Sequence, residues 1–149
     1  MPKLDLAAIP QTNATGYPPV HADVVQGRWY RRLAPAAGLE DFGASHVVLQ
    51  PGAWSSQRHW HVGEDELVVM LSGEAVLVDD TGETPMRAGD VAAFPKNDGN
   101  GHVLQNRSVE PCCFVAIGRP QSTDCHYPDI DMHLSAEVGE QRRKDGTAF

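Results

Sequence analysis

Histidine and carboxylate side chains gather in one short stretch of the chain, RHWHVGEDELVVMLSG (58–73). In a β-strand, residues i and i+2 point to the same face with Cα atoms about 6.6 Å apart, so His59 and His61 can direct two imidazoles at one metal ion. Glu66 begins the apolar run that follows, and a turn over 62–65 can return its carboxylate to the histidines. The pattern predicts three metal ligands from one hairpin.

A fourth candidate ligand, His102, opens the run GHVLQN after a glycine-rich loop. An antiparallel barrel can place this run opposite the first pair of histidines. Three imidazoles and one carboxylate suit a divalent first-row metal (Mn, Fe, Co, Ni, Cu or Zn), whereas Ca²⁺ and Mg²⁺ prefer oxygen ligands. We therefore predict one divalent transition metal per subunit, of open identity, bound by His59, His61, Glu66 and His102.

Strands must position these ligands, and residues 24–119 consist largely of short runs of β-prone residues. Turn signals such as Pro51-Gly52, Ser72-Gly73 and Asn97-Asp98-Gly99 separate the runs. No window in this range shows a sustained apolar period of 3.6 residues. The spacing predicts an all-β sandwich or barrel. Any helix is expected late, as a short turn over 135–140.

The length of 149 residues is that of one ordinary domain, and 41% of the residues are apolar, enough for a core. We expect a single domain over 1–149, with a barrel core at about 24–119. Residues 1–23, rich in Pro, Thr, Asn and Gly, predict an irregular arm that is extended or partly disordered. The tail over 120–149 is polar, but Tyr127, Met132 and Phe149 predict that it packs on the barrel.

Two groups of residues carry a family resemblance. The first contains Gly52, His59, His61, Glu66 and Gly73, and the second contains Gly89, Pro95, His102 and Asn106. They resemble the two conserved motifs of the cupin superfamily, over roughly residues 45–118. The wider pattern is similar to a group of bacterial single-domain cupins with a cupin 2 type conserved barrel.

This resemblance implies a jelly-roll barrel, also called a double-stranded β-helix, in which the two histidines and the glutamate of the first motif and the histidine of the second bind the metal. The sequence departs from the family's pattern in two places. The loop before His102 carries extra residues, and Ala53 stands where a glycine often begins the first motif. Neither departure removes a ligand.

Glu64 and Asp65 compete with Glu66 for the carboxylate position. The family spacing favours Glu66, and its parity turns Val68 and Met70 toward the barrel interior, whereas Asp65 points the other way. By the same parity, several side chains near the ligands are expected to face the barrel interior, where they could line a small-molecule pocket. Filling of the core would explain the same residue types equally well. The pocket candidates are Gln57, Val68, Met70, Phe94, Leu104 and Asn106.

Two functions follow from these residues. The leading hypothesis is a metal-dependent enzyme that acts on a small polar or carboxylate-bearing metabolite; the resemblance admits oxygenases, decarboxylases, isomerases, lyases and hydrolases. The alternative is a non-catalytic cupin that binds a sugar or another metabolite, with the metal structural or absent. A titratable group beside the metal that is not a ligand would favour the enzyme, and Glu64, Asp65, Gln57 and Tyr127 are the candidates.

The charge of the chain limits its partners. Twenty acidic residues against twelve basic ones give a formal net charge of −8, which is unfavourable for binding nucleic acid or an anionic membrane. The N-terminal residues contain no apolar run of signal-peptide length, so we expect a cytoplasmic protein. Open strand edges predict a homodimer, in which the arm or the run at 24–33 extends the sheet of a neighbouring subunit.

Overall fold

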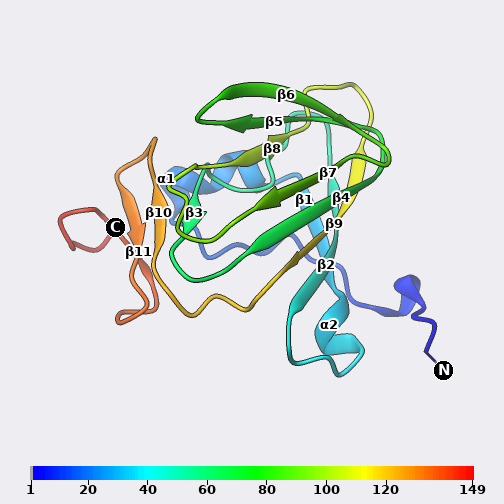
Figure 1. Cartoon of the computed structure of the whole chain (residues 1–149), viewed down its shortest axis with the longest axis horizontal. Coiled ribbons are helices and arrows are strands. Elements are labelled where there is room, and N and C mark those ends of the chain that lie inside the picture. The colour runs from blue at the N-terminus through cyan, green and yellow to red at the C-terminus, as the bar shows by residue number, and fades with distance from the viewer. Residues whose placement is uncertain (1) are drawn as a thin grey trace.

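The computed structural model describes residues 2–149, and β-strands dominate this part of the chain (Figure 1). Its helical segments are η1 (Leu6–Ala8), α1 (Pro19–Ala22), η2 (Asp23–Val25) and α2 (Leu33–Ala36). Its strands are β1 (Arg28–Arg32), β2 (Gly43–Leu49), β3 (Trp60–His61), β4 (Glu66–Ser72), β5 (Glu74–Asp79), β6 (Gly82–Arg87), β7 (Val91–Phe94), β8 (Val103–Gln105), β9 (Cys112–Gly118), β10 (Cys125–Tyr127), β11 (Met132–Leu134) and β12 (Gln141–Arg142).

The strands form three antiparallel sheets. A five-stranded sheet has the order β1-β2-β9-β4-β7, and a three-stranded sheet, β6-β5-β8, faces it across the core (Figure 1). The third sheet, β12-β11-β10-β3, closes one end of the molecule. The prediction of an all-β jelly-roll barrel is confirmed.

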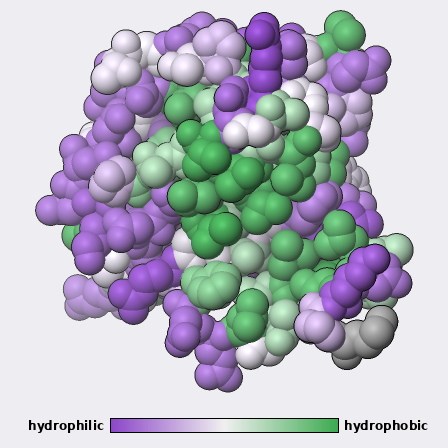
Figure 2. Space-filling view, turned by 45° about the vertical axis from the view of Figure 1, so that its right-hand side comes forward, coloured by the Kyte–Doolittle hydropathy of each residue, from purple (hydrophilic) through white to green (hydrophobic). Residues whose placement is uncertain are grey.

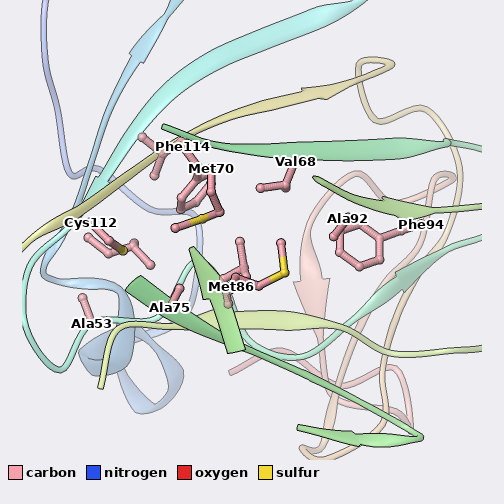
Figure 3. Close-up of a cluster of buried hydrophobic side chains, with 12 residues drawn as sticks. Ala53, Val68, Met70, Ala75, Met86, Ala92, Phe94, Cys112 and Phe114 are labelled. Carbon is pink, nitrogen blue, oxygen red and sulfur yellow. The ribbon is translucent and has the colours of Figure 1, made fainter. Parts of the chain in front are cut away.

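The five-stranded sheet lines the barrel with side chains whose size changes along the strands. Tyr30, Val47, Phe114 and Met70 lie side by side across β1, β2, β9 and β4. Met86 and Ala75 of the three-stranded sheet face them across the core (Figure 3). Met70 and Met86 are almost fully buried, whereas Tyr30, Val47 and Phe114 also border the barrel's cavity as its closed floor, and we call this part the filled end.

Toward the other end of the same strands, the inward side chains become small. The next inward row contains Arg32, Ser45, Ala116, Val68 and Ala92, and the row after it contains Gly43, Gly118, Glu66 and Phe94. A Cβ atom on Gly118 would lie 3.4 Å from Cγ of Glu66, so a larger residue there would crowd the glutamate. The small residues leave the barrel open, and we call this part the open end.

The N-terminal arm and the helices differ from the expectation that helix comes late. All four helical segments lie before residue 37, and residues 135–140 form turns. Segments of three or four residues are too short to show a helical period in the sequence. Between its short helical segments the arm pairs with β1: the backbone N–H groups of Thr12 and Tyr30 donate to each other's carbonyls at 3.1 and 2.9 Å.

The C-terminal tail packs on the barrel, as predicted. Strand β10 pairs with β3, which sets Cys125 opposite His61 and His126 opposite Trp60. Cys125, Tyr127 and Met132 form a small buried cluster, and the Phe149 ring meets His21 edge-on at 5.5 Å. The sequence pattern did not show these short strands. Among residues 2–149, none of the helices has the length and apolar character that a membrane span needs.

Candidate metal centre

Three imidazoles converge on the carboxylate of Glu66 at the open end. The Nε2 atoms of His59, His61 and His102 lie 3.7, 3.5 and 2.8 Å from the Glu66 oxygens. His59 and His102 meet in an antiparallel bridge, with backbone N–H to carbonyl distances of 3.2 and 2.9 Å. His61 comes from β3 and Glu66 from the first residue of β4. The residues that the sequence singled out therefore lie together.

The donor atoms fit a transition metal. The ligand atoms of His59, Glu66 and His102 all lie within 4.8 Å of one another, and His61 joins the group through Glu66. Bonds of about 2.0–2.2 Å to one ion place neighbouring ligand atoms about 3 Å apart, so small side-chain movements suffice. Nitrogen donors with one carboxylate are the set that borderline divalent metals prefer. The cluster can hold such an ion.

Neighbouring groups hold the imidazoles in place. The Nδ1 atom of His59 lies 2.9 Å from the carbonyl oxygen of Gln57 and 3.2 Å from Oγ of Ser56. A proton on this Nδ1 leaves Nε2 with its lone pair facing Glu66. The His102 ring stacks on Phe94, with ring centroids 3.7 Å apart and planes 3° from parallel. These contacts orient the donor nitrogens toward one point.

The electrostatics of the metal-free cluster favour an ion pair. Burial alone would raise the pKa of Glu66, but hydrogen bonds from His102, His59 and His61 lower it far below its ordinary value. Burial alone would lower the pKa of His61, but Cys125 and Glu66 raise it to about 10. Burial also lowers the pKa of His102. Glu66 is thus ionised and His61 holds a proton, which a bound metal would have to displace.

Glu64 lies behind the cluster and ties the tail to it. Its oxygens accept hydrogen bonds from the backbone N–H groups and hydroxyls of Ser122 and Thr123, at 2.6–3.1 Å. Its Oε2 lies 3.6 Å from Nδ1 of His61. The Thr123 hydroxyl also accepts from the N–H of Gly63, where a Cβ atom would clash with Thr123 at 2.4 Å. Asp65 points away and accepts from the N–H of Lys96.

A cavity of about 680 Å³ opens over the cluster. Val68, Phe94 and Leu104, three of the predicted pocket residues, line it. The other three lie elsewhere. Met70 is buried in the filled end, and the Gln57 amide donates to the carbonyl of His21 at 2.9 Å. The Asn106 amide donates to the carbonyls of Leu49 and Glu110 at 2.9 and 2.8 Å, which makes it a structural tie.

The tail contributes to the cavity wall, and Cys125 and Tyr127 are its two residues beside the histidines. The ligand atoms of Cys125, His59 and His61 lie within 4.8 Å of one another, and the Tyr127 ring centroid lies 5.9 Å from that of His59. Tyr127 is one of the non-ligand candidates predicted from the sequence, whereas no sequence motif indicates Cys125. Its place depends on the pairing of β10 with β3, for which the sequence carries no local signal.

Comparisons with known proteins agree with this geometry. The family model described as the cupin domain matches residues 45–118, the range over which the sequence motifs indicated the resemblance. An oxalate-binding protein of Thermotoga maritima is 33% identical over 73 residues, which are 49% of this chain and 58% of that protein. The chain thus spans little more than half the length of this relative.

Two solved structures extend the comparison. A sugar phosphate isomerase of the cupin superfamily from Silicibacter pomeroyi is 43% identical and has a TM-score of 0.92, covering 99% of this chain and 96% of its own. A cupin 2 conserved barrel domain protein from Salinispora arenicola is 26% identical with a TM-score of 0.58, covering 80% of this chain and 87% of its own. With both motifs present and the barrel shared almost end to end, the chain belongs to the cupin superfamily.

Proposed function

We propose that this chain is a metal-dependent enzyme that acts on a small polar or carboxylate-bearing metabolite. The observation that carries the proposal is the convergence of three imidazole nitrogens on Glu66 at the base of an open cavity. His59, His61, Glu66 and His102 would hold one divalent ion chosen from Mn, Fe, Co, Ni, Cu and Zn. Bound there, the ion supplies Lewis-acid polarisation of a substrate oxygen or of water.

The protein's own residues supply position and exclusion of water. Ser56 and the carbonyl of Gln57 fix His59, Phe94 fixes His102, and Glu64 lies behind His61. Tyr127 is a buried phenol in the cavity wall, and burial holds its pKa far above the ordinary value. It therefore stays protonated at neutral pH and is available as a hydrogen-bond donor to a bound oxygen. The aliphatic side chains of Val68 and Leu104 supply an apolar part of the wall.

The relatives suggest where a substrate screen begins. The structure that covers 99% of this chain is named a sugar phosphate isomerase, and the curated relative is named for binding oxalate. Both names describe small oxygen-rich anions. A screen with sugar phosphates and short dicarboxylates therefore addresses the proposed class directly, with isomerisation of a sugar phosphate as its first reaction.

Metal analysis of protein purified without added metal, followed by the screen with that metal restored, tests the proposal. We expect one ion per chain and turnover of at least one anionic substrate. A bound ion without turnover, and with no exchangeable ligand position, would favour the alternative, a cupin that only binds its metabolite. Absence of metal binding under all six ions would refute the enzyme and the metal site together.

We also propose a homodimer, formed by the outer face of the five-stranded sheet. Figure 2 shows a broad apolar area on one side of the molecule. Leu71 and Val91, at the ends of β4 and β7, are 47% and 57% exposed, and Trp29 of β1 is 36% exposed. The edge of β1 is already paired with Thr12 at Tyr30, so a face contact is better supported than extension of the sheet there.

Light scattering at micromolar concentration tests the dimer. Leu71→Asp and Val91→Asp should each give a monomer of unchanged secondary structure, because both side chains are exposed in the isolated subunit. A wild-type monomer at this concentration would refute the dimer.

A further inference from the structure

The cavity wall holds an excess of positive charge that the metal site does not use. Arg28, Arg32 and Arg119 line the cavity, and we call them the cationic rim. Glu66, a proposed metal ligand, is the one acidic residue of the wall among residues 2–149. The whole chain, in contrast, has twenty acidic residues and twelve basic ones. The local charge is therefore opposite in sign to that of the chain.

The rim arginines also differ from most other arginines in their partners. Arg58, Arg87, Arg107 and Arg142 each form an ion pair with a carboxylate. Within the described part of the chain, no carboxylate pairs with Arg28, Arg32 or Arg119. Arg28 is half-buried and donates to the carbonyls of Ser55 and Ala14, which hold the guanidinium without neutralising it. A positive charge kept partly out of water is stabilised when an anion binds beside it.

The strand pattern directs this charge inward. In β1, Arg28, Tyr30 and Arg32 share the face that lines the cavity, whereas Trp29 and Arg31 point to the outside. Arg32 lies opposite Ser45, which in turn lies opposite Ala116, so its neighbours along this row are small and its own side chain stays exposed. Arg119 follows Gly118, the last residue of β9, and lines the same cavity. Both arginines therefore border the cavity that also contains the metal ligands.

From this arrangement we infer that the substrate carries two anionic or strongly polar groups. One group reaches the metal ligands, and the second, a phosphate monoester or a carboxylate, binds Arg32 and Arg119. This inference rests on the proposed function for its first group only. The residues of the second site belong to β1 and to the segment after β9, outside the 45–118 range that the family model matches. They would set the length and charge of the substrate.

Calorimetric titration of metal-free protein with orthophosphate at low ionic strength tests the second site alone. Arg32→Ala is the main variant, because no hydrogen bond ties this exposed side chain to the described residues, and Arg119→Ala is the second. Loss of one charge-assisted contact should weaken phosphate binding by at least about tenfold. Arg31→Ala is the matched control on the opposite face of the same strand and should leave binding unchanged. Added salt should weaken wild-type binding.

Malonate in place of orthophosphate, in the same titration, shows which anion the rim prefers. The tighter ligand identifies the second group as phosphate or carboxylate. If neither anion binds the wild type, or if Arg31→Ala weakens binding as much as Arg32→Ala, the inference is wrong.

Metal-loaded protein then tests the two-group substrate. Ribose 5-phosphate should bind more tightly than ribose to the wild type, and Arg32→Ala should remove this difference while the metal content stays at one ion per chain. An equal affinity for the two sugars in the wild type would overturn the inference. Because the orthophosphate titration uses metal-free protein, its result can be interpreted even if the proposed metal site proves wrong. If the protein binds metal normally but binds no anion, only the proposal that the cationic rim binds an anion is refuted.

Discussion

The two ends of the barrel use the same strands for different purposes. Along β4 the inward side chains run from Met70 through Val68 to Glu66, which is a change from core to cavity wall to ligand within five residues. Along the run that ends in β8, His102 lies two residues before the buried Leu104. The filled end buries large apolar groups, whereas the open end keeps its polar groups beside a cavity. The residues that form the apolar core and the residues that could bind a metal thus lie toward opposite ends of the barrel.

We therefore expect that substitutions in the site leave the fold intact. The apolar core is distributed over β2, β4, β6 and β9, and the candidate ligands contribute little to it. A rigid filled end then acts as the support that holds the ligand-bearing ends of the strands in position. Four sets of substitutions test this separation, beginning with those expected to change metal binding most.

The largest effect should come from the ligands themselves. His59→Ala and His102→Ala should each lower metal affinity by more than about 100-fold, because each removes one of the four donors that converge on the ion. The far-UV circular dichroism spectrum should stay that of the wild type. His133→Ala, a histidine outside the cluster, is the control, and metal content by mass spectrometry is the measurement. Full occupancy in both ligand variants would show that the ion binds elsewhere.

A change in the filled end should have the opposite result. Met70→Ala should lower the free energy of unfolding by about 2–5 kcal/mol, because it leaves a cavity in a close-packed core. The folded variant should still bind one metal ion per chain. Val69→Ala, on the outer face of the same strand, should cost less. Chemical denaturation measures the stability of the variant, and metal analysis measures its metal content. If Met70→Ala loses the metal while it remains folded, the two ends do not act separately.

Filling the open end should abolish anion binding and leave metal binding intact. Ala116→Leu places a larger side chain between Ser45 and Val68, in space that belongs to the cavity. The free energy of unfolding should change by no more than about 1–3 kcal/mol in either direction. Orthophosphate binding should be lost, and metal stoichiometry should be kept. Val115→Leu, on the opposite face of β9, is the control; unchanged anion binding in Ala116→Leu would contradict the cavity's role.

The smallest effect concerns the contact that holds the tail near the open end. Arg58 donates to both oxygens of Asp129 at 2.7 Å and also pairs with Asp80. The Arg58 guanidinium lowers the pKa of Asp129, so the pair stabilises the fold above the ordinary pKa of 3.8 and loses its effect as the pH falls through the lowered value. Because the carboxylate is 56% exposed, screening limits the contribution to less than about 1 kcal/mol.

Thermal unfolding of Asp129→Asn at several pH values measures this contribution. The variant should melt slightly below the wild type at neutral pH, and the two should converge well below pH 3.8. Asp41→Asn, a change at an exposed loop, controls for the loss of one negative charge. A difference that grows on acidification would contradict the sign of the argument.

The sequence predicted the ligands and the barrel because both depend on local pattern. The two-residue periodicity of strand side chains in His59-x-His61 and the turn signals between runs can be recognised without a structure. The depth of a residue along the barrel is not readable in this way. Met70 has the inward parity of Val68, but it lies one row further from the ligands, in the filled end.

The irregular segments account for the other differences. Gln57 was placed by strand parity, yet residues 55–58 form bends and the regular strand begins at Trp60. Asn106 lies just past β8, where its amide meets backbone carbonyls of two other segments. Cys125 reaches the histidines through a three-residue strand whose partner lies far away in the sequence. Such pairings depend on tertiary contacts that no short pattern encodes.

The position of β10 has a consequence for how such proteins diverge. Cys125 and Tyr127 belong to the cavity wall but come from a segment that lies beyond the residues matched by the family model. A barrel with the same two motifs and a different segment at this place would keep its metal ligands and present a different cavity wall. The segment after the barrel, more than the barrel itself, would then decide which molecules enter the cavity.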